Sequence, residues 1–258
     1  MENMENQVKR KLKERQEITS VFLRIPDPAA AELMVAEEVD LLVIDQEHYV
    51  FPEEMITQIL RVTNNTKTSC LIRVSQVEQE KIGRLLDAGA GGILLADAKD
   101  AKQVKELVNA VKYAPLGKRG VSTESRSNGY GLKTKDLKAF PGIENQNTII
   151  GVIIETQSAI EALDEILKIR EVDFLSVGTM DLTYACNVPG ETKHRSVIKL
   201  KREIYKKITE AGKSALDKVF EEADIEAARK NGINCFYLAS DMELMKRGIE
   251  SRLSALGC

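Results

Sequence analysis

The hydrophobic positions along the chain follow two alternating patterns. Short runs of aliphatic and β-branched residues, such as residues 41–44, are separated by longer stretches in which apolar residues fall at helical spacing, such as residues 101–112. Unbroken apolar runs are typical of parallel strands buried on both faces, and the alternation is typical of βαβ units. We predict strands at residues 19–24, 41–44, 69–74, 92–95, 148–154, 173–177, 214–216 and 235–238.

A helix follows each strand in this series. Asp27 and Pro28 supply an N-cap and a first-turn proline for the first of them, and Gly89 is a suitable residue after the end of another. The helices are expected to begin near residues 28, 52, 78, 101, 158, 199, 223 and 242. About eight strand–helix pairs predict an α/β fold that closes as a (β/α)8 TIM barrel. An open doubly wound sheet is the alternative, but the G-x-G-x-x-G turn that it would carry does not follow Arg24.

No Gly/Ser/Pro-rich linker divides the chain, so we expect one barrel domain over residues 1–258, with a helical extension at residues 1–17. The segment from residue 113 to residue 147 has little apolar periodicity and contains many glycines and serines. Loops longer than about 15 residues in compact domains are usually functional or disordered. We expect this loop near the site, where Lys118, Arg119 and Arg126 could face an anionic ligand or a neighbouring subunit. An insertion without a role is the alternative.

Charge and composition narrow the range of partners. The 258 residues include 37 Lys and Arg against 40 Asp and Glu, so no basic field predicts nucleic-acid binding. The N-terminal stretch is charged and lacks the apolar core of a signal peptide, and no apolar run approaches the roughly 20 residues of a membrane span. The four cysteines are scattered without a CxxC pair, which favours neither disulfides nor zinc. These features predict a cytoplasmic protein.

Polar residues follow several of the predicted strands, where barrel enzymes carry their chemistry. One of only two histidines, His48, follows the second strand. Arg73 lies within an apolar strand and therefore needs a buried partner or an anionic ligand. Glu155 and Asp181 would repel each other unless a cation or a proton lies between them. The candidates are Asp45, Glu47, His48, Arg73, Glu155 and Asp181.

Each candidate has a purely structural alternative. Asp45 could cap a turn, and Glu47 and His48 could lie in solvent. If Glu155 and Asp181 do hold a cation, oxygen ligands suit Mg²⁺ or Mn²⁺ rather than a thiolate zinc site. The second histidine, His194, lies in a hydrophilic stretch and is read as structural or exposed.

Several segments carry a family resemblance. The sequence resembles the HpcH/HpaI aldolases, which are metal-dependent (class II) pyruvate aldolases with a phosphoenolpyruvate/pyruvate-like barrel. The similarity runs from about residue 19 to the last helix, and its D-x-E-H element is fairly specific. The matching segments are residues 42–48, 72–73, 86–90, 113–120, 154–156 and 177–182.

The resemblance implies a role for individual residues. It implies that Glu155 and Asp181 bind a divalent metal (Mg²⁺, Mn²⁺ or Co²⁺) that holds pyruvate. His48 would be the general base, Asp87 would orient it, and Arg73 would stabilise the enolate oxygen. Other implied substrate contacts are Gly178, Thr179, Met180 and Asp181, with Asp45 and Glu47 in support. Retro-aldol cleavage of a 4-hydroxy-2-oxo acid suits this set, because histidine has a pKa near neutrality and cations act where enolate charge develops.

Three positions depart from the family pattern. Ile153 replaces a glutamine, Met180 replaces a small residue, and Ala96 is followed by Asp97 where a proline is usual. These changes predict either a narrowed pocket or a diverged binding barrel without aldolase activity. An oxaloacetate-type decarboxylase and a citrate-lyase-like acyl-CoA lyase are further alternatives. A class I aldolase would need a Schiff-base lysine, for which the candidates are Lys213 and Lys218. The resemblance also implies a homo-oligomer, a hexamer with an exchanged C-terminal helix.

Overall fold

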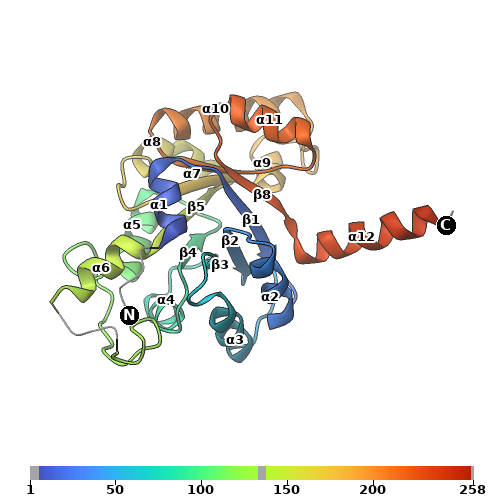
Figure 1. The fold of residues 1–258 in the computed structure, drawn as a ribbon. Coiled ribbons are helices and arrows are strands. Elements are labelled where there is room, and N and C mark those ends of the chain that lie inside the picture. The colour runs from blue at the N-terminus through green and yellow to red at the C-terminus, as the bar shows by residue number, and fades with distance from the viewer. Residues whose placement is uncertain (1–5, 133–137, 257–258) are drawn as a thin grey trace.

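The computed structural model describes residues 6–132 and 138–256 and contains a closed barrel of eight parallel strands (Figure 1). Each strand pairs with its sequence neighbours, and the first strand closes the ring by pairing with the last. The predicted TIM barrel is therefore confirmed. The strands are β1 (Ile18–Leu23), β2 (Leu41–Asp45), β3 (Ser69–Val74), β4 (Gly92–Leu95), β5 (Ile149–Ile154), β6 (Phe174–Val177), β7 (Ser214–Lys218) and β8 (Cys235–Ser240).

Helices surround the barrel and connect its strands (Figure 1). The side chain of Asp27 accepts a hydrogen bond from the backbone N–H of Ala29, as predicted for an N-cap. The helices are α1 (Gln7–Glu14), α2 (Pro28–Ala36), α3 (Glu53–Thr63), α4 (Gln79–Asp87), α5 (Ala101–Val111), α6 (Phe140–Asn147), α7 (Gln157–Glu161), α8 (Leu163–Ile166), α9 (Thr179–Ala185), α10 (Arg195–Glu210), α11 (Glu222–Lys230) and α12 (Asp241–Ala255).

The buried apolar residues form two clusters that follow the alternation of side chains along the strands. The larger cluster lies between the strands and the surrounding helices and includes Leu42 and Ile44. The smaller cluster fills the inside of the barrel and includes Leu41 and Val43 from the same strand. Because β2 is buried on both faces, its sequence is an unbroken apolar run rather than an alternating one.

The amino-terminal helix α1 belongs to the barrel interior cluster. Its residues Val8 and Leu12 are buried in that cluster although the rest of the helix is strongly charged. The side chain of its N-cap residue, Asn6, accepts a hydrogen bond from Ser69 Oγ at the start of β3, at 2.8 Å. The helix thus covers the amino-terminal end of the barrel and leaves the carboxyl ends of the strands free to build a site.

Three details of the helices differ from the sequence expectation. The helix expected at residues 158–168 is two short helices, α7 and α8, that meet at Ala162. The short helices α6 and α9 were not predicted, because eight and seven residues provide too little apolar periodicity to be recognised.

The long segment at residues 113–147, which is described at residues 113–132 and 138–147, lies elsewhere than expected. It joins the end of α5 to the start of β5, and both lie at the amino-terminal end of the barrel. Within it, Ser127 donates its backbone N–H to the carbonyl of Asp87 and Arg126 Nη1 donates to the carbonyl of Ala88, both at the end of α4. Within one chain, this loop is therefore not beside the carboxyl ends of the strands. A loop that follows a helix returns to the opposite end of the barrel.

The last helix, α12, projects away from the barrel (Figure 1). Only its first residue, Asp241, is buried, and large apolar side chains are exposed along its length. These include Leu244, Met245, Ile249 and Leu253. Within residues 6–132 and 138–256, the helices are too short or too polar to cross a membrane.

Candidate active site

The inward-facing side chains change from apolar to polar at the carboxyl ends of the strands. Asp45, Arg73 and Glu155 each lie two residues beyond an apolar residue of the barrel interior cluster. Side chains two residues apart lie on the same face of a strand, so all three face the mouth of the barrel. The preceding apolar residues are Val43, Leu71 and Ile153.

A buried ion pair joins β2 and β3 at this mouth. Asp45 and Arg73 are directly opposite in the parallel register. Arg73 donates from Nε to Asp45 Oδ1 at 3.0 Å and from Nη2 to Asp45 Oδ2 at 2.5 Å. Burial raises the pKa of Asp45, but the bonds from Arg73 outweigh it and hold this pKa below its usual value. The two-point contact fixes the guanidinium plane, as such pairs do.

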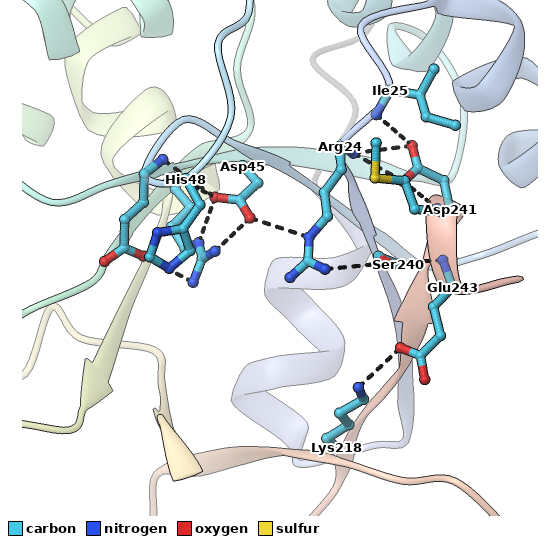
Figure 2. A network of polar contacts seen from close by, with 11 residues as sticks. Arg24, Ile25, Asp45, His48, Lys218, Ser240, Asp241 and Glu243 are labelled. Atoms are coloured by element: carbon cyan, nitrogen blue, oxygen red, sulfur yellow. Dashed lines mark hydrogen bonds and ion pairs between the residues drawn. The ribbon is translucent and has the colours of Figure 1, made fainter. Parts of the chain in front are cut away.

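Asp45 also shapes the turn that carries the histidine. Its Oδ1 accepts backbone N–H groups from Glu47 and His48, each at 3.3 Å. The expectation that Asp45 caps this turn therefore holds together with its contact to Arg73. The result is a short turn after β2 in which His48 is exposed at the mouth (Figure 2).

Glu47 connects the arginine with the histidine. Its Oε2 lies 2.9 Å from Arg73 Nη1 and 3.7 Å from His48 Nε2. Burial raises the pKa of Glu47, and the neighbouring carboxylates Asp45 and Asp181 add to this effect, whereas Arg73 opposes it. Within one chain, Glu47 is therefore the carboxylate that stands beside the imidazole of His48.

Glu155 is a buried carboxylate at the end of β5. Its Oε1 accepts the backbone N–H of Asp97 at 2.6 Å, and its other oxygen packs against Gly178. A Cβ built on Gly178 would lie 1.9 Å from Glu155 Oε2, so only glycine fits there. Burial, together with the charges of Glu47 and Asp181, raises the pKa of Glu155 to about 7 against the opposing effect of the Asp97 hydrogen bond.

The donor set at Glu155 and Asp181 is compatible with a hard divalent cation. Asp181 lies in the first turn of α9, and its charge acts on both Glu155 and Glu47. The charge of Asp181 raises the pKa values of both Glu155 and Glu47, and a cation among the three carboxylates would relieve this repulsion. Among the described residues, no group of three or more His, Cys, Asp or Glu side chains has metal-binding geometry. Two protein carboxylates plus water would match the way Mg²⁺ is usually held.

The implied substrate contacts after β6 fall into two groups. Gly178 and Thr179 begin α9 and are partly buried, whereas Met180 is exposed. Ile153 is buried in the barrel interior cluster, two residues before Glu155 on the inward face. The predicted departures therefore lie at or directly below the mouth.

Asp87 does not join this group within one chain. It ends α4 at the opposite end of the barrel, and its Oδ1 accepts a hydrogen bond from Arg119 Nη2 at 2.6 Å. Arg119 in turn lies over the ring of Tyr113, 4.5 Å from its centroid. No contact joins Asp87 to His48 in the described residues. The second histidine, His194, is the N-cap of α10 and accepts from the backbone N–H of Ser196, in keeping with a structural role.

Sequence reasoning missed one cation at the mouth, Arg24, and considered another, Lys218, only as a Schiff-base lysine. Arg24, after β1, lies with Nε 3.4 Å from Asp45 Oδ2, and Lys218, at the end of β7, pairs with Glu243 Oε2 at 2.9 Å (Figure 2). Arg24 lies two residues after Phe22 and Lys218 lies two residues after Leu216, and both apolar residues face the barrel interior. This two-residue spacing was the signal available in the sequence. The other lysine considered for a Schiff base, Lys213, instead donates to the backbone carbonyls of Ile169 and Val172, in the turn before β6.

The fold and the site define a TIM-barrel protein with an acidic, arginine-containing mouth. The sequence profile of the HpcH/HpaI aldolase/citrate lyase family matches residues 19–247, and the chain belongs to this family. It is 27% identical to a hydroxypyruvate/pyruvate aldolase of Roseobacter denitrificans over 241 residues, 93% of each chain.

Solved structures agree with the fold. The HpcH/HpaI aldolase of Desulfitobacterium hafniense superimposes with a TM-score of 0.89 at 24% identity, over 96% of each chain. The citrate synthase SbnG superimposes with a TM-score of 0.86 at 24% identity, over 97% of each chain. At these identities, the likeness describes the fold and leaves the substrate open.

Proposed function

We propose that this protein is a metal-dependent aldolase that cleaves 4-hydroxy-2-oxo acids to pyruvate and an aldehyde. The observation that carries the proposal is the placement of Arg73 and His48 in one barrel mouth with Glu155 and Asp181. Glu47 couples the two pairs, since it contacts Arg73 and His48 and its charge acts on Glu155. Family membership supports a lyase of this kind.

Each side chain has a defined task in this reaction. His48 accepts the proton of the C4 hydroxyl, for which imidazole is suited near neutral pH. Arg73 is a fixed cation, held by Asp45 and Glu47, that faces the oxygen on which enolate charge develops.

Glu155 and Asp181 would hold the divalent metal, Mg²⁺, Mn²⁺ or Co²⁺. When bound, it would supply Lewis-acid polarisation of the substrate's oxo group. Burial disfavours the ionised form of Glu155 and raises its pKa, and a cation bound beside the carboxylate would favour the ionised form again. Gly178, Thr179 and Met180 would line the side on which the oxo acid lies.

The proposed assembly is a homo-oligomer, a hexamer with an exchanged α12. The apolar side chains exposed along the projecting α12 support it, because exposed apolar surface of this kind usually marks an interaction site. Since Asp87 lies away from His48 in its own chain, any contact between them would have to form across two copies.

A class I mechanism through Lys218 is less well supported. Its ammonium group pairs with Glu243 and lies 4.6 Å from the ring centroid of Phe220. Both contacts hold the Lys218 amine against protein groups, whereas a Schiff base requires the amine to be free to attack the substrate carbonyl.

The test is pyruvate release from 4-hydroxy-2-oxo acids of several chain lengths with Mg²⁺, Mn²⁺ or Co²⁺. We expect metal-dependent release that His48→Ala reduces by at least a hundredfold. The matched control is His194→Ala, at the other histidine, which should retain wild-type activity. Absence of release across the panel would refute the proposal. Faster release of CO₂ from oxaloacetate than of pyruvate would favour the decarboxylase.

A further inference from the structure

The hydroxyl group of Tyr205 lies between β6 and β7 at the point where their pairing ends. Ser176 and Leu216 are the last residues paired in the parallel register. Beyond this pair, Tyr205 Oη accepts the backbone N–H of Val177 at 3.3 Å and donates to the carbonyl oxygen of Leu216 at 2.8 Å. A side chain from α10, outside the barrel, therefore continues the hydrogen bonding between the two strands.

The surroundings of Tyr205 hold this hydroxyl in place. The residue is 2% exposed and belongs to the larger apolar cluster between the strands and the helices. Burial and the charge of Asp217 raise the pKa of Tyr205, so the hydroxyl keeps the proton that it donates. Lys201, one turn earlier on α10, pairs with Asp217 at 2.7 Å and ties the same helix to β7.

The end of β6 is thereby held from both sides. On the β5 side, Gly178 donates its backbone N–H to the carbonyl oxygen of Ile154 at 3.2 Å. On the β7 side, the bond from Val177 to Tyr205 stands where a direct bond to the neighbouring strand would otherwise lie. Successive backbone N–H groups of a strand point to opposite neighbours, so loss of either bond would free one side of this strand end.

This strand end sets the position of a proposed metal ligand. Gly178 contacts the carboxylate of Glu155, and a Cβ built on Gly178 would lie 1.9 Å from Glu155 Oε2. The next residue begins α9, and Asp181 lies in the first turn of this helix. The backbone after Val177 therefore determines where Asp181 stands relative to Glu155. Because Mg²⁺ requires nearly ideal ligand positions at about 2.1 Å, a small displacement of this backbone would weaken its binding.

We propose that Tyr205 is a positioning residue that sets the distance between the carboxylates of Glu155 and Asp181. The inference rests on the proposed function, in which these two residues hold the divalent metal. Tyr205 lies in the cluster outside the strands, so it acts through the backbone of β6 and not by contact with the metal. Its ring packs in the core, whereas the positioning role depends on the hydroxyl group alone.

The first experiment measures the affinity for Mn²⁺ by calorimetry. Tyr205→Phe keeps the ring and removes the hydroxyl, and we expect it to weaken Mn²⁺ binding by about tenfold, the lower end for residues that orient metal ligands. Ile208→Val loosens the buried face of the same helix without touching the hydroxyl and should keep the wild-type affinity. Tyr113→Phe should keep it as well, because the buried Tyr113 hydroxyl has no hydrogen-bond partner within residues 6–132 and 138–256.

The second experiment follows amide hydrogen exchange with a chelator present, so it requires neither metal nor substrate. The amide of Val177 should exchange slowly in the wild type, since it is buried and hydrogen-bonded. In Tyr205→Phe it should exchange at least tenfold faster relative to the amide of Val152, which lies within the barrel on β5. Fast exchange of Val177 in the wild type would overturn the inference even if Tyr205→Phe did not fold.

The outcomes separate this inference from the aldolase function. An unchanged Mn²⁺ affinity in Tyr205→Phe, or an equal loss of affinity in Ile208→Val, would overturn the role of Tyr205 and leave pyruvate release as the test of the aldolase. Weaker Mn²⁺ binding in Tyr205→Phe alone, without cleavage of any hydroxy acid, would support the role of Tyr205 and refute only the aldolase function. Absence of Mn²⁺ binding in the wild type would overturn both.

Discussion

Glu155→Gln should stabilise the protein in the absence of metal, and increasingly so as the pH rises. The amide preserves the shape of the side chain and its acceptor for the Asp97 N–H, but it removes the buried charge. Burial raises the pKa of Glu155 to about 7 from its ordinary value of 4.5. At about 1.4 kcal/mol per pH unit, keeping this carboxylate ionised in the fold costs about 3 kcal/mol.

The sign follows from the two pKa values. Below pH 4.5 the carboxyl group is protonated in both folded and unfolded chains, and the cost is absent. Between pH 4.5 and pH 7 the unfolded chain ionises first, and above pH 7 the full cost is present. The free energy of unfolding of Glu155→Gln minus that of the wild type should thus rise by about 2–3 kcal/mol between pH 5 and pH 8.

Urea unfolding with a chelator present measures this difference at several pH values. A difference that stays constant from pH 5 to pH 8 would refute the placement of Glu155 as a buried, uncompensated carboxylate. Addition of Mg²⁺ should reverse the order at pH 8, because a bound cation stabilises only the folded wild type. The pH series with chelator tests whether the carboxylate is buried, and the addition of Mg²⁺ tests whether it binds a metal.

Two further substitutions test the substrate side of the mouth. Gly178→Ala should displace the Glu155 carboxylate by more than 1 Å, because a Cβ would lie 1.9 Å from its Oε2. Since Glu155 is a proposed metal ligand, metal affinity should fall, and the aldolase rate should fall by a factor on the order of 10². A metal affinity that calorimetry finds unchanged would contradict this prediction. Met180→Ala should change folding stability by no more than about 0.5 kcal/mol, because the side chain is exposed. It should broaden the range of accepted aldehydes at constant metal affinity, and an unaltered range with an unaltered KM would exclude Met180 as a restriction on the pocket.

The strands could be predicted closely because the barrel buries them on both faces. Residues 69–74 and 92–95 were expected as strands and are observed with the same limits as β3 and β4. The seventh strand was expected only at residues 214–216, whereas β7 continues to Lys218. Its last two residues are polar because they reach the mouth, so the hydrophobic pattern ended before the backbone pairing did.

The convergence of the polar residues was also predictable, but their pairing was not. The carboxyl ends of parallel strands meet at one end of a barrel, which is enough to bring His48, Arg73 and Glu155 together. The bond between Asp45 and Arg73 depends on the register of β2 against β3. The alternation of apolar and polar residues fixes which face a residue occupies, but β2 and β3 are buried on both faces and show no such alternation, so their sequences provide little information about register.

The position of Asp87 relative to His48 also depends on the barrel topology. It precedes Ala88 and Gly89 at the end of α4, and a residue at the end of a barrel helix lies at the amino-terminal end of the strands. The topology alone therefore separates it from His48, which follows β2, within one chain. The resemblance implies that the two residues serve one site, and under the proposed function such a site would have to draw on more than one copy. Because α12 begins at Asp241, directly after its N-cap Ser240, and carries Glu243 beside Lys218, any assembly that repositions α12 would act directly on the contacts of Arg24 and Lys218 at the barrel mouth.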